Sequence, residues 1–329
     1  MSERVTIKSI ARDLGISHMT VSRALSGHPS VLKETREAVQ NRARELGYVK
    51  HAAANVMRGQ TTRIVGLLLP NIVNEFYARF ANTMALACEA QSLQLIIHLT
   101  GDEAGAERQA LARLNEVQAQ GVVMVPVPGS DGAMTLKPRP MSVVQLIRQS
   151  GADAAPTILV DDDQALQGAV AHLAEKGHRA IAYIGADSRL SSGQSRLASF
   201  RAGLERAGVA ERPELLFTGT PTAEIGAQRM RQVLGDGAAT ALVCGGVEIS
   251  NGALSAMMAA GVSPTGPFDL VGYGDPSFYA WIGGGLTTIG VPVERLAHKA
   301  VELMVAASPP PRIHRFEAAL IVRPGSPPG

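Results

Sequence analysis

The sequence predicts a small all-α unit followed by a larger α/β domain with two lobes and doubly wound parallel sheets. The chain has 329 residues, of which 46% are hydrophobic, so it exceeds one ordinary domain and can bury sizeable cores. Its basic residues are concentrated at one end. Strand and helix patterns alternate after residue 63, which is typical of parallel sheets covered by helices.

The charge is distributed unevenly along the chain. Residues 1–63 contain 11 Lys or Arg and 5 Asp or Glu, whereas the remainder contains 20 basic and 24 acidic residues. A small basic unit therefore precedes a larger acidic one. This distribution favours a polyanionic partner for the N-terminal unit alone.

The cysteines and the apolar segments exclude several protein classes. Cys88 and Cys244 are too few for a disulfide framework, and no metal-type spacing of Cys and His surrounds them. The first residues contain no apolar stretch of a signal peptide, and no apolar run approaches the length of a membrane span. We expect a cytoplasmic protein that has no membrane partner and no metal.

Apolar residues at helical spacing predict three short helices within residues 1–48. Thr6 caps the first helix, which ends at Gly15, a residue able to adopt positive φ. Ser17 caps the second helix. The third runs from about Lys33 to Leu46 and closes the core. Two short helices joined by a tight glycine turn, with a third behind them, form the helix-turn-helix plan.

The second helix of this plan enters the major groove of DNA with its N-terminal residues against the base edges. Arg23 suits the O6 and N7 atoms of guanine, and His18 and Met19 suit base edges or a thymine methyl. The alternative is an ordinary three-helix bundle with a solvated polar face.

The run from Ile7 to Gly27 resembles the headpiece of the LacI/GalR family of bacterial regulators. The segments Thr20-Val21-Ser22-Arg23 and 45–48 strengthen the match. The resemblance implies that His18 and Met19 choose the operator bases. It assigns phosphate and base contacts to Thr20, Ser22 and Arg23, and we add the two helix caps, Thr6 and Ser17, to the DNA-binding candidates.

Residues 49–62 form an Ala-rich segment that is too short to be a stable helix alone. The resemblance implies a hinge that becomes helical only on operator DNA, where Met57 wedges into a minor-groove base step. Asn55 and Arg58 would meet groove edges or phosphates. Lys50-His51 replaces the usual Pro-Asn at the start of this segment, so we expect a looser hinge. The alternative is a plain flexible linker.

Residues 63–329 are predicted to form the two-lobed domain. The run 63–70 is continuously apolar, which is typical of a buried parallel strand, and βα units repeat to about residue 273. This length needs two sheets, and ligands of such sheets bind beyond the carboxyl ends of the strands. Residues 176–185 and 286–289 resemble the LacI/GalR sensor, which is periplasmic-binding-protein-like (type I). That likeness implies lobe crossovers near residues 161, 290 and 321.

The resemblance places several effector-binding candidates in the cleft between the lobes. Phe76 and Tyr77 match an aromatic position that stacks on a sugar, although one of them can instead belong to the core. Arg196 matches an arginine that bonds ligand hydroxyls or a carboxylate. Arg148 aligns loosely with a cleft strand, and a solvated surface arginine is the stronger interpretation. Asp275 is either a cleft residue or a turn residue.

One departure from the family pattern bears on the ligand. Members usually carry Asn-Asp where this chain has Gly246-Val247, and the side chain of Val247 cannot accept a hydrogen bond. We therefore expect Arg196 to leave the cleft positive and to hold a carbohydrate-derived anion, such as a sugar acid or a sugar phosphate. The alternative is that Glu248 acts as the substitute acceptor and that the ligand is neutral.

These patterns together predict a transcriptional regulator, most simply a repressor. We expect it to bind a palindromic operator as a homodimer under the control of a small effector. No catalytic arrangement or cofactor fingerprint stands out, so neither an enzyme nor a cofactor is expected. The tail 323–329 lacks apolar heptads, which favours a dimer over a tetramer. The alternative is a solute-binding protein for a neutral sugar or nucleoside.

Overall fold

The computed structural model describes residues 5–48, 62–129, 141–150, 155–306 and 313–325. The chain divides into two compact units, residues 1–62 and residues 63–329. The predicted hinge residues Asn55, Met57 and Arg58 lie outside the described residues.

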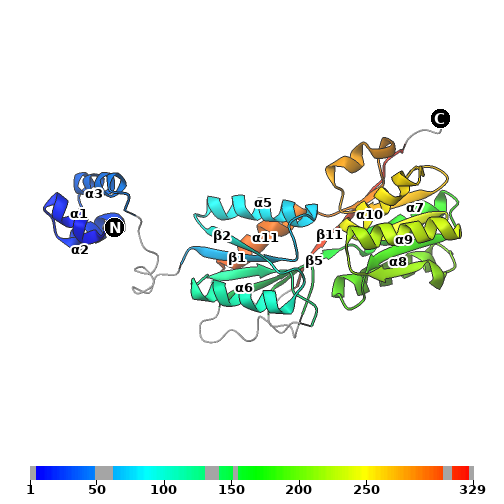
Figure 1. Ribbon diagram of the computed structural model, residues 1–329, viewed down its shortest axis with the longest axis horizontal. Coiled ribbons are helices and arrows are strands. Elements are labelled where there is room, and N and C mark those ends of the chain that lie inside the picture. The colour runs from blue at the N-terminus through cyan, green and yellow to red at the C-terminus, as the bar shows by residue number, and fades with distance from the viewer. Residues whose placement is uncertain (1–4, 49–61, 130–140, 151–154, 307–312, 326–329) are drawn as a thin grey trace. The chain divides into compact units, whose positions relative to one another are not determined.

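The first unit contains three helices around one small core (Figure 1). They are α1 (Ile7–Leu14), α2 (His18–Leu25) and α3 (Lys33–Glu45). Each helix contributes apolar side chains at helical spacing, as the sequence predicted. The buried members are Ile10, Ala11, Val21, Ala24, Val31, Val39 and Ala43.

Local signals set the ends of α1 and α2. The Thr6 hydroxyl accepts a hydrogen bond from the backbone amide of Ser9, and the Ser9 hydroxyl in turn accepts one from the amide of Thr6. Gly15 ends α1 with φ 64°, a conformation that glycine adopts without a steric penalty. Ser17 caps α2 by accepting from the amide of Thr20 at 3.0 Å. The predicted roles of these three residues as helix ends are confirmed.

The second unit has two lobes, each built on a six-stranded sheet. All described strand pairs are parallel except that of β10 with β12. The sheet of lobe 1 has the order β11-β5-β4-β3-β1-β2, and that of lobe 2 has the order β12-β10-β9-β8-β6-β7. Lobe 1 contains β1 (Ile64–Leu69), β2 (Gln94–Leu99), β3 (Gly121–Met124), β4 (Ser142–Leu146), β5 (Thr157–Asp161) and β11 (Ile313–Glu317). Lobe 2 contains β6 (Ile181–Ala186), β7 (Leu216–Gly219), β8 (Ala241–Gly245), β9 (Asp269–Tyr273), β10 (Thr288–Gly290) and β12 (Ala319–Ile321).

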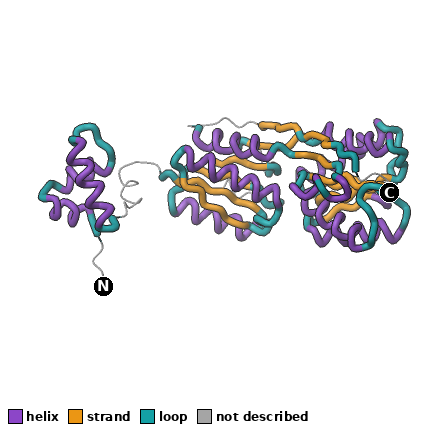
Figure 2. Tube along the Cα trace, turned by 90° about the horizontal axis from the view of Figure 1, so that it is seen from above, coloured by secondary structure: helices purple, strands orange, loops and turns teal. Residues whose placement is uncertain are grey.

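Helices cover both faces of each sheet (Figures 1 and 2). In lobe 1, α5 (Glu75–Ala90) and α11 (Val293–Val305) cover one face, and α6 (Ala104–Glu116) covers the other. In lobe 2, α7 (Asp163–Glu175) pairs with α8 (Ser191–Arg206), and α9 (Ala223–Asp236) pairs with α10 (Val247–Ala259). A strand covered on both faces must be apolar at every position. In β1, Leu67 belongs to the core under α5 and α11, whereas Leu68 packs with α6.

The chain crosses between the lobes three times. The first crossing follows β5 at Asp162, and the second lies between β10 and α11, near Val291. The third lies at Ala318, whose amide donates to the carbonyl of Asp161 at 2.8 Å. The prediction placed this crossing near Ile321, the last residue of β12.

Two helices of lobe 2 begin next to the cleft. Helix α8 begins at Ser191, and α10 begins at Val247, directly after β8 and Gly246. Residues 208–240 contain the short 3-10 helix η2 (Pro213–Leu215), β7 and α9. Strand β7 has four residues with mixed burial, so it lacks the apolar run that identifies a central strand. Two further 3-10 helices, η3 (Ser277–Ala280) and η4 (Ile282–Gly284), follow β9.

Candidate nucleic-acid interface and effector cleft

Helix α2 directs its polar residues away from the core of the first unit. Val21 and Ala24 are fully buried, so the helical period turns the intervening positions outward. His18, Met19 and Arg23 are exposed, with 57% of Met19 accessible. Thr20 and Ser22 are half-buried beside them. The residues predicted to read DNA therefore share one face.

Two arginines of α3 connect this helix to the rest of the first unit. Arg42 donates to the Asp13 carboxylate at 2.7 Å and so ties α3 to α1. Arg36 donates to the carbonyls of His28 and Val31 at 2.9 and 3.2 Å, which fixes the turn between α2 and α3. These contacts connect α3 to α1 and to the turn that follows α2.

A cavity of about 280 Å³ lies between the two lobes, at the carboxyl ends of their strands. In lobe 1 its walls come from the segments after β1, β2 and β4, and in lobe 2 from the segments after β6, β7 and β8 and from the end of β9. Val160 of β5 and Val291 after β10 complete the lining. This is where ligands of open α/β sheets bind. The structure brings six of the predicted effector residues together in its lining: Phe76, Tyr77, Arg148, Arg196, Val247 and Glu248.

Asp275 does not belong to this lining, which corrects its prediction as a cleft residue. Both of its carboxylate oxygens accept hydrogen bonds from Arg323, at 2.8 and 3.1 Å. Asp275 also has φ 53°, as expected of a turn residue. The partner comes from the C-terminal end of the chain, so no local pattern around Asp275 pointed to it.

The two aromatic residues stand in the first turn of α5. The Asn74 side chain caps this helix by accepting from the amide of Phe76 at 3.0 Å. The rings of Phe76 and Tyr77 meet edge to face with centroids 5.4 Å apart, and Phe76 also stacks on Phe80. Both residues are buried in the lobe 1 core, and both line the cavity. Burial raises the pKa of Tyr77, so its hydroxyl stays protonated and can donate to a ligand.

Arg196 is buried and already engaged in several interactions. Its Nε donates to Asp162 Oδ2 at 2.6 Å, and its Nη1 donates to the Gly245 carbonyl at 3.1 Å. The guanidinium lies 4.2 Å from the centroid of the Tyr273 ring, and the Tyr273 hydroxyl donates to the same Asp162 oxygen at 2.6 Å. Burial alone lowers the pKa of Arg196, but the interactions with Tyr273 and Asp162 outweigh it and raise the pKa. Arg196 therefore carries a compensated charge.

Arg148 is also buried, with 5% of its surface accessible, which corrects its interpretation as a solvated surface arginine. Its Nη1 and Nη2 donate to the two oxygens of Asp102, at 2.5 and 3.3 Å. Two residues here have left-handed backbone conformations, with φ 59° at Asp102 and 52° at Ile147. Such conformations cost on the order of 1–3 kcal/mol and persist only where the surroundings hold them. The backbone is thus constrained to place this ion pair in the cavity wall.

These pairings change the expected charge of the cleft. Arg196 was predicted to leave it positive, but Asp162 balances Arg196 and Asp102 balances Arg148. The described lining includes one further carboxylate, that of Glu248, which has no basic partner among the described residues. The prediction of a positive cleft does not hold, because both arginines hold carboxylates from distant parts of the chain.

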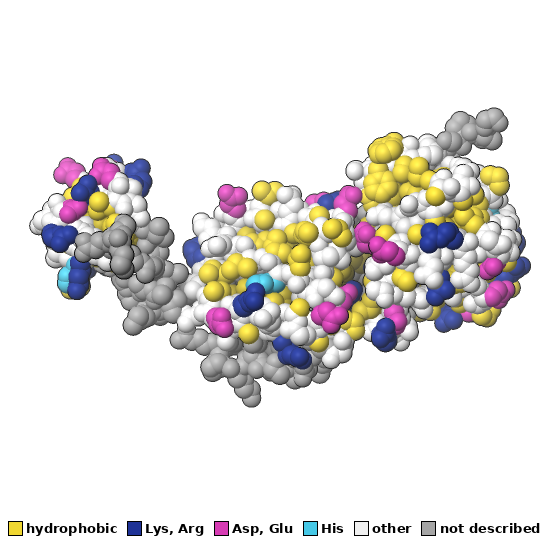
Figure 3. All heavy atoms as spheres, viewed as in Figure 1, with side chains coloured by type: hydrophobic (Ala, Val, Ile, Leu, Met, Phe, Trp, Pro, Cys, Tyr) yellow, Lys and Arg dark blue, Asp and Glu magenta, His cyan; other side chains and the backbone are white. Residues whose placement is uncertain are grey.

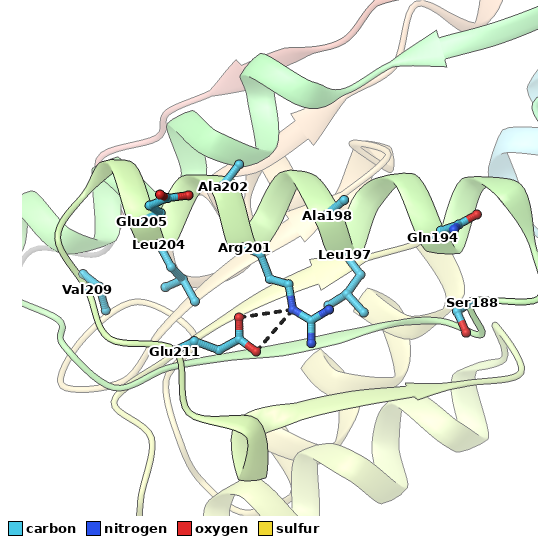
Figure 4. Close-up of a pocket in the computed structure, with 10 residues that line it drawn as sticks. All are labelled: Ser188, Gln194, Leu197, Ala198, Arg201, Ala202, Leu204, Glu205, Val209 and Glu211. Carbon is cyan, nitrogen blue, oxygen red and sulfur yellow. Dashed lines mark hydrogen bonds and ion pairs between the residues drawn. The ribbon is translucent and has the colours of Figure 1, made fainter.

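A second hollow, of about 790 Å³, lies along α8 (Figure 4). Arg201 spans it with hydrogen bonds from Nε to both oxygens of Glu211, at 3.2 and 3.1 Å. The hollow contains none of the predicted site residues and no buried charged side chain. We therefore regard the cleft cavity as the candidate ligand site.

No group of acidic, His and Cys side chains in the described residues is suited to a metal ion. None of the described helices is long and apolar enough to span a membrane.

Comparisons with known proteins agree with this arrangement. Residues 6–51 match the family described as bacterial regulatory proteins, lacI family, and residues 170–324 match a periplasmic binding protein-like domain. The transcriptional regulator GalR of Escherichia coli (strain K12) is 28% identical over 97% of this chain and 94% of its own length. The chain belongs to the LacI/GalR family.

Other LacI/GalR members are also similar to this chain in sequence or in fold. The sucrose operon repressor of Klebsiella pneumoniae is 30% identical over 66% of each chain. The Lac repressor dimer bound to operator and the anti-inducer ONPF has a TM-score of 0.85 with 21% identity, covering 98% of this chain and 99% of that one. These likenesses confirm the predicted fold of helix-turn-helix unit and two-sheet α/β domain.

Family membership makes this chain a DNA-binding transcriptional regulator. GalR and the sucrose operon repressor are named as a regulator and a repressor and not as enzymes, in agreement with the sequence analysis. A headpiece of this family also disfavours the alternative of a solute-binding protein.

Proposed function

We propose that this regulator binds a palindromic operator as a homodimer, most simply as a repressor, and that an effector in the cleft controls its operator affinity. Because its proposed partner is operator DNA, we expect the protein to act in the cytoplasm. In this proposal the chain has three functional parts: a DNA-binding headpiece at residues 1–48, a hinge at 49–62 and an effector-binding domain at 63–329.

The observation that carries the proposal is the exposed polar face of α2 on its braced core. His18 and Met19 would select base edges, and Arg23 is positioned for a guanine. Thr20 and Ser22 would meet phosphates and the neighbouring bases. The capped N-termini of α1 and α2, at Thr6 and Ser17, would approach the DNA backbone, as helix N-termini favour anions. Asn55, Met57 and Arg58 complete the proposed DNA contacts through the minor groove.

Exposed apolar side chains support the homodimer. In lobe 1, Leu86 on α5 and Leu99 on β2 are 61% and 53% exposed, and Ile97 on β2 is 42% exposed. Hydrophobic side chains gather over this part of the surface (Figure 3). Trp281 in lobe 2 is 71% exposed. Large exposed apolar residues mark contact surfaces, and a two-fold dimer would bury the same surface on both copies.

The cleft cavity is the proposed effector site, because it joins both lobes and contains converging polar groups beside aromatic rings. Ligand bound there would change the angle between the lobes and so the geometry of the headpieces, a coupling that must act in both directions. A relative named as the regulator CelR was solved with cellobiose, which supports a carbohydrate-derived effector. The paired arginines favour a ligand without net negative charge over the sugar acid or sugar phosphate.

Selection from random DNA with the full chain tests the proposal. We expect a two-fold symmetric sequence to be enriched and to bind far more tightly than a scrambled duplex at the same salt concentration. Exchanging the residues at positions 18 and 19 should change the selected bases without abolishing binding, whereas exchange of the exposed Leu32 serves as the control. Enrichment of no sequence at all would contradict the proposal and favour a solute-binding role.

A further inference from the structure

Glu248 is held in place by a chain of neutral hydrogen bonds. It stands in the first turn of α10 and lines the cleft cavity. Asn251, one turn later, donates to Glu248 Oε1 at 3.4 Å. The Tyr279 hydroxyl donates to the Asn251 Oδ1 at 3.1 Å, so it fixes which end of the amide faces Glu248. Tyr279 is fully buried. The carboxylate is therefore positioned, while its other oxygen has no partner among the described residues.

Glu248 differs in this respect from the two carboxylates that pair with the arginines of the cleft. Asp102 and Asp162 each accept a hydrogen bond from an arginine, at 2.5 and 2.6 Å. Glu248 has no basic neighbour in the described chain, and Glu224, at the start of α9, adds a second negative charge nearby. Burial raises the pKa of Glu248, and the charge of Glu224 raises it further. A partly buried carboxylate without a counter-charge is costly unless a ligand supplies one.

The charges around the cavity favour a cation at this place. Asp102 neutralises Arg148, and Asp162, which does not line the cavity, neutralises Arg196, so Glu248 is the one charge of the described lining without an opposite charge beside it. An ammonium group would form a charge-assisted hydrogen bond to Glu248, which is stronger than one between neutral groups. An anionic ligand would instead meet the uncompensated carboxylate.

We propose that the effector is a small amine whose protonated nitrogen pairs with Glu248 and whose oxygen contacts Arg196. This inference rests on the proposed effector site. Nη2 of Arg196 has no hydrogen-bond partner among the described residues and lies free to donate to a ligand oxygen. Phe76 and Tyr77 supply an apolar surface on the opposite lobe. The cavity, of about 280 Å³, has room for a small ligand.

Thermal-shift measurements on the full chain test the charge of the ligand. The probes are sets that share a carbon skeleton: D-glucosamine, D-glucose and D-gluconate; D-galactosamine, D-galactose and D-galacturonate; and amino alcohols and amino acids of similar size. The proposal expects the largest rise in Tm from an amine. A panel in which neutral or acidic compounds stabilise best, or in which no amine raises Tm, overturns it.

Substitution of Glu248 tests the contact itself. Glu248→Gln keeps the shape and the bond from Asn251 but removes the charge, so the affinity for the stabilising amine should fall about tenfold or more by calorimetry. Glu224→Gln is the matched control, because Glu224 lies nearby but does not line the cavity, and it should lower the affinity far less. Equal affinity of Glu248→Gln and the unsubstituted chain overturns the proposal. The Tm of each variant without ligand shows that it is folded.

Operator binding by the same preparations separates two kinds of failure. If the chain selects a palindromic DNA sequence but no amine binds through Glu248, the inference about the effector is wrong and the proposed regulator stands. If the chain selects no DNA sequence, the proposed function itself is wrong.

Discussion

The headpiece and the cleft use arginine in opposite ways. Arg23 on α2 is exposed and faces solvent. Arg148 and Arg196 in the cleft are buried, and each donates to a carboxylate. An exposed guanidinium keeps its hydration and is available to a large polyanion, whereas a buried one needs a fixed partner to offset its desolvation. The comparison shows that an arginine in a predicted site is informative only once its burial and its partner are known.

The largest effect is expected on the free energy of unfolding when the carboxylate that pairs with Arg196 is removed. Asp162→Ala leaves a buried charge unpaired and should lower the free energy of unfolding by about 3–5 kcal/mol. Asp162→Asn keeps an acceptor and should cost less. Urea unfolding followed by circular dichroism measures both.

The matched control for this variant is Asp187→Ala, which breaks the exposed pair with Arg189. Surface pairs contribute little, so its unfolding should hardly change. If the two alanine variants lose similar stability, the contrast between buried and exposed arginines does not hold.

Arg23→Ala should weaken operator binding by roughly 5- to 150-fold, because a bidentate contact to a base edge is lost. Fluorescence anisotropy with the selected operator at fixed salt measures this change. The control is Arg44→Ala on α3, an exposed arginine that donates to Asn41 and does not belong to the α2 face. Similar losses in both variants would mean that affinity depends on basic charge alone and not on the position of Arg23.

Ser17→Ala removes the cap of α2 and should destabilise its first turn by about 1 kcal/mol. Native-state hydrogen exchange should then show the α2 amides, Thr20 among them, exchanging roughly fivefold faster. Ser26→Ala is the comparison, since the Ser26 hydroxyl donates to the Arg23 carbonyl and does not cap the N-terminus. Unchanged exchange in Ser17→Ala would show that the exposed face of α2 does not depend on this cap.

The smallest effect is expected on the melting temperature of Glu248→Gln without ligand. The raised pKa of Glu248 means that ionisation disfavours the folded state. The penalty is absent at low pH, where the carboxyl is protonated in both states, and grows as pH rises from the ordinary glutamate range through the raised pKa. The variant should therefore melt slightly above the unsubstituted chain at neutral pH and equally at low pH. A variant that melts lower at neutral pH would show that the Glu248 charge is already compensated within the protein.

Much of the headpiece was predictable because its signals are local. Thr6, Gly15 and Ser17 act on residues within one helical turn, so their effect can be deduced from the order of residues alone. The same holds for the repeated βα units, because strands covered on both faces are continuously apolar. The sequence by itself thus determined the fold class, the exposed face of α2 and six of the side chains that line the cleft.

Only the tertiary structure decided which of the cleft charges remain free. Arg196 finds Asp162 across 34 residues of sequence, Arg148 finds Asp102 across 46, and Arg323 finds Asp275 across 48. No local periodicity encodes such pairings, since they depend on how the ends of separate strands meet at one edge of a sheet. From the sequence alone, Arg196 was therefore expected to be unpaired and Arg148 to be exposed to solvent. In the folded chain both arginines pair with carboxylates, and Glu248 remains without an opposite charge. The physical reason is that a buried charge is stable only beside an opposite charge, and the fold decides which residues lie close enough.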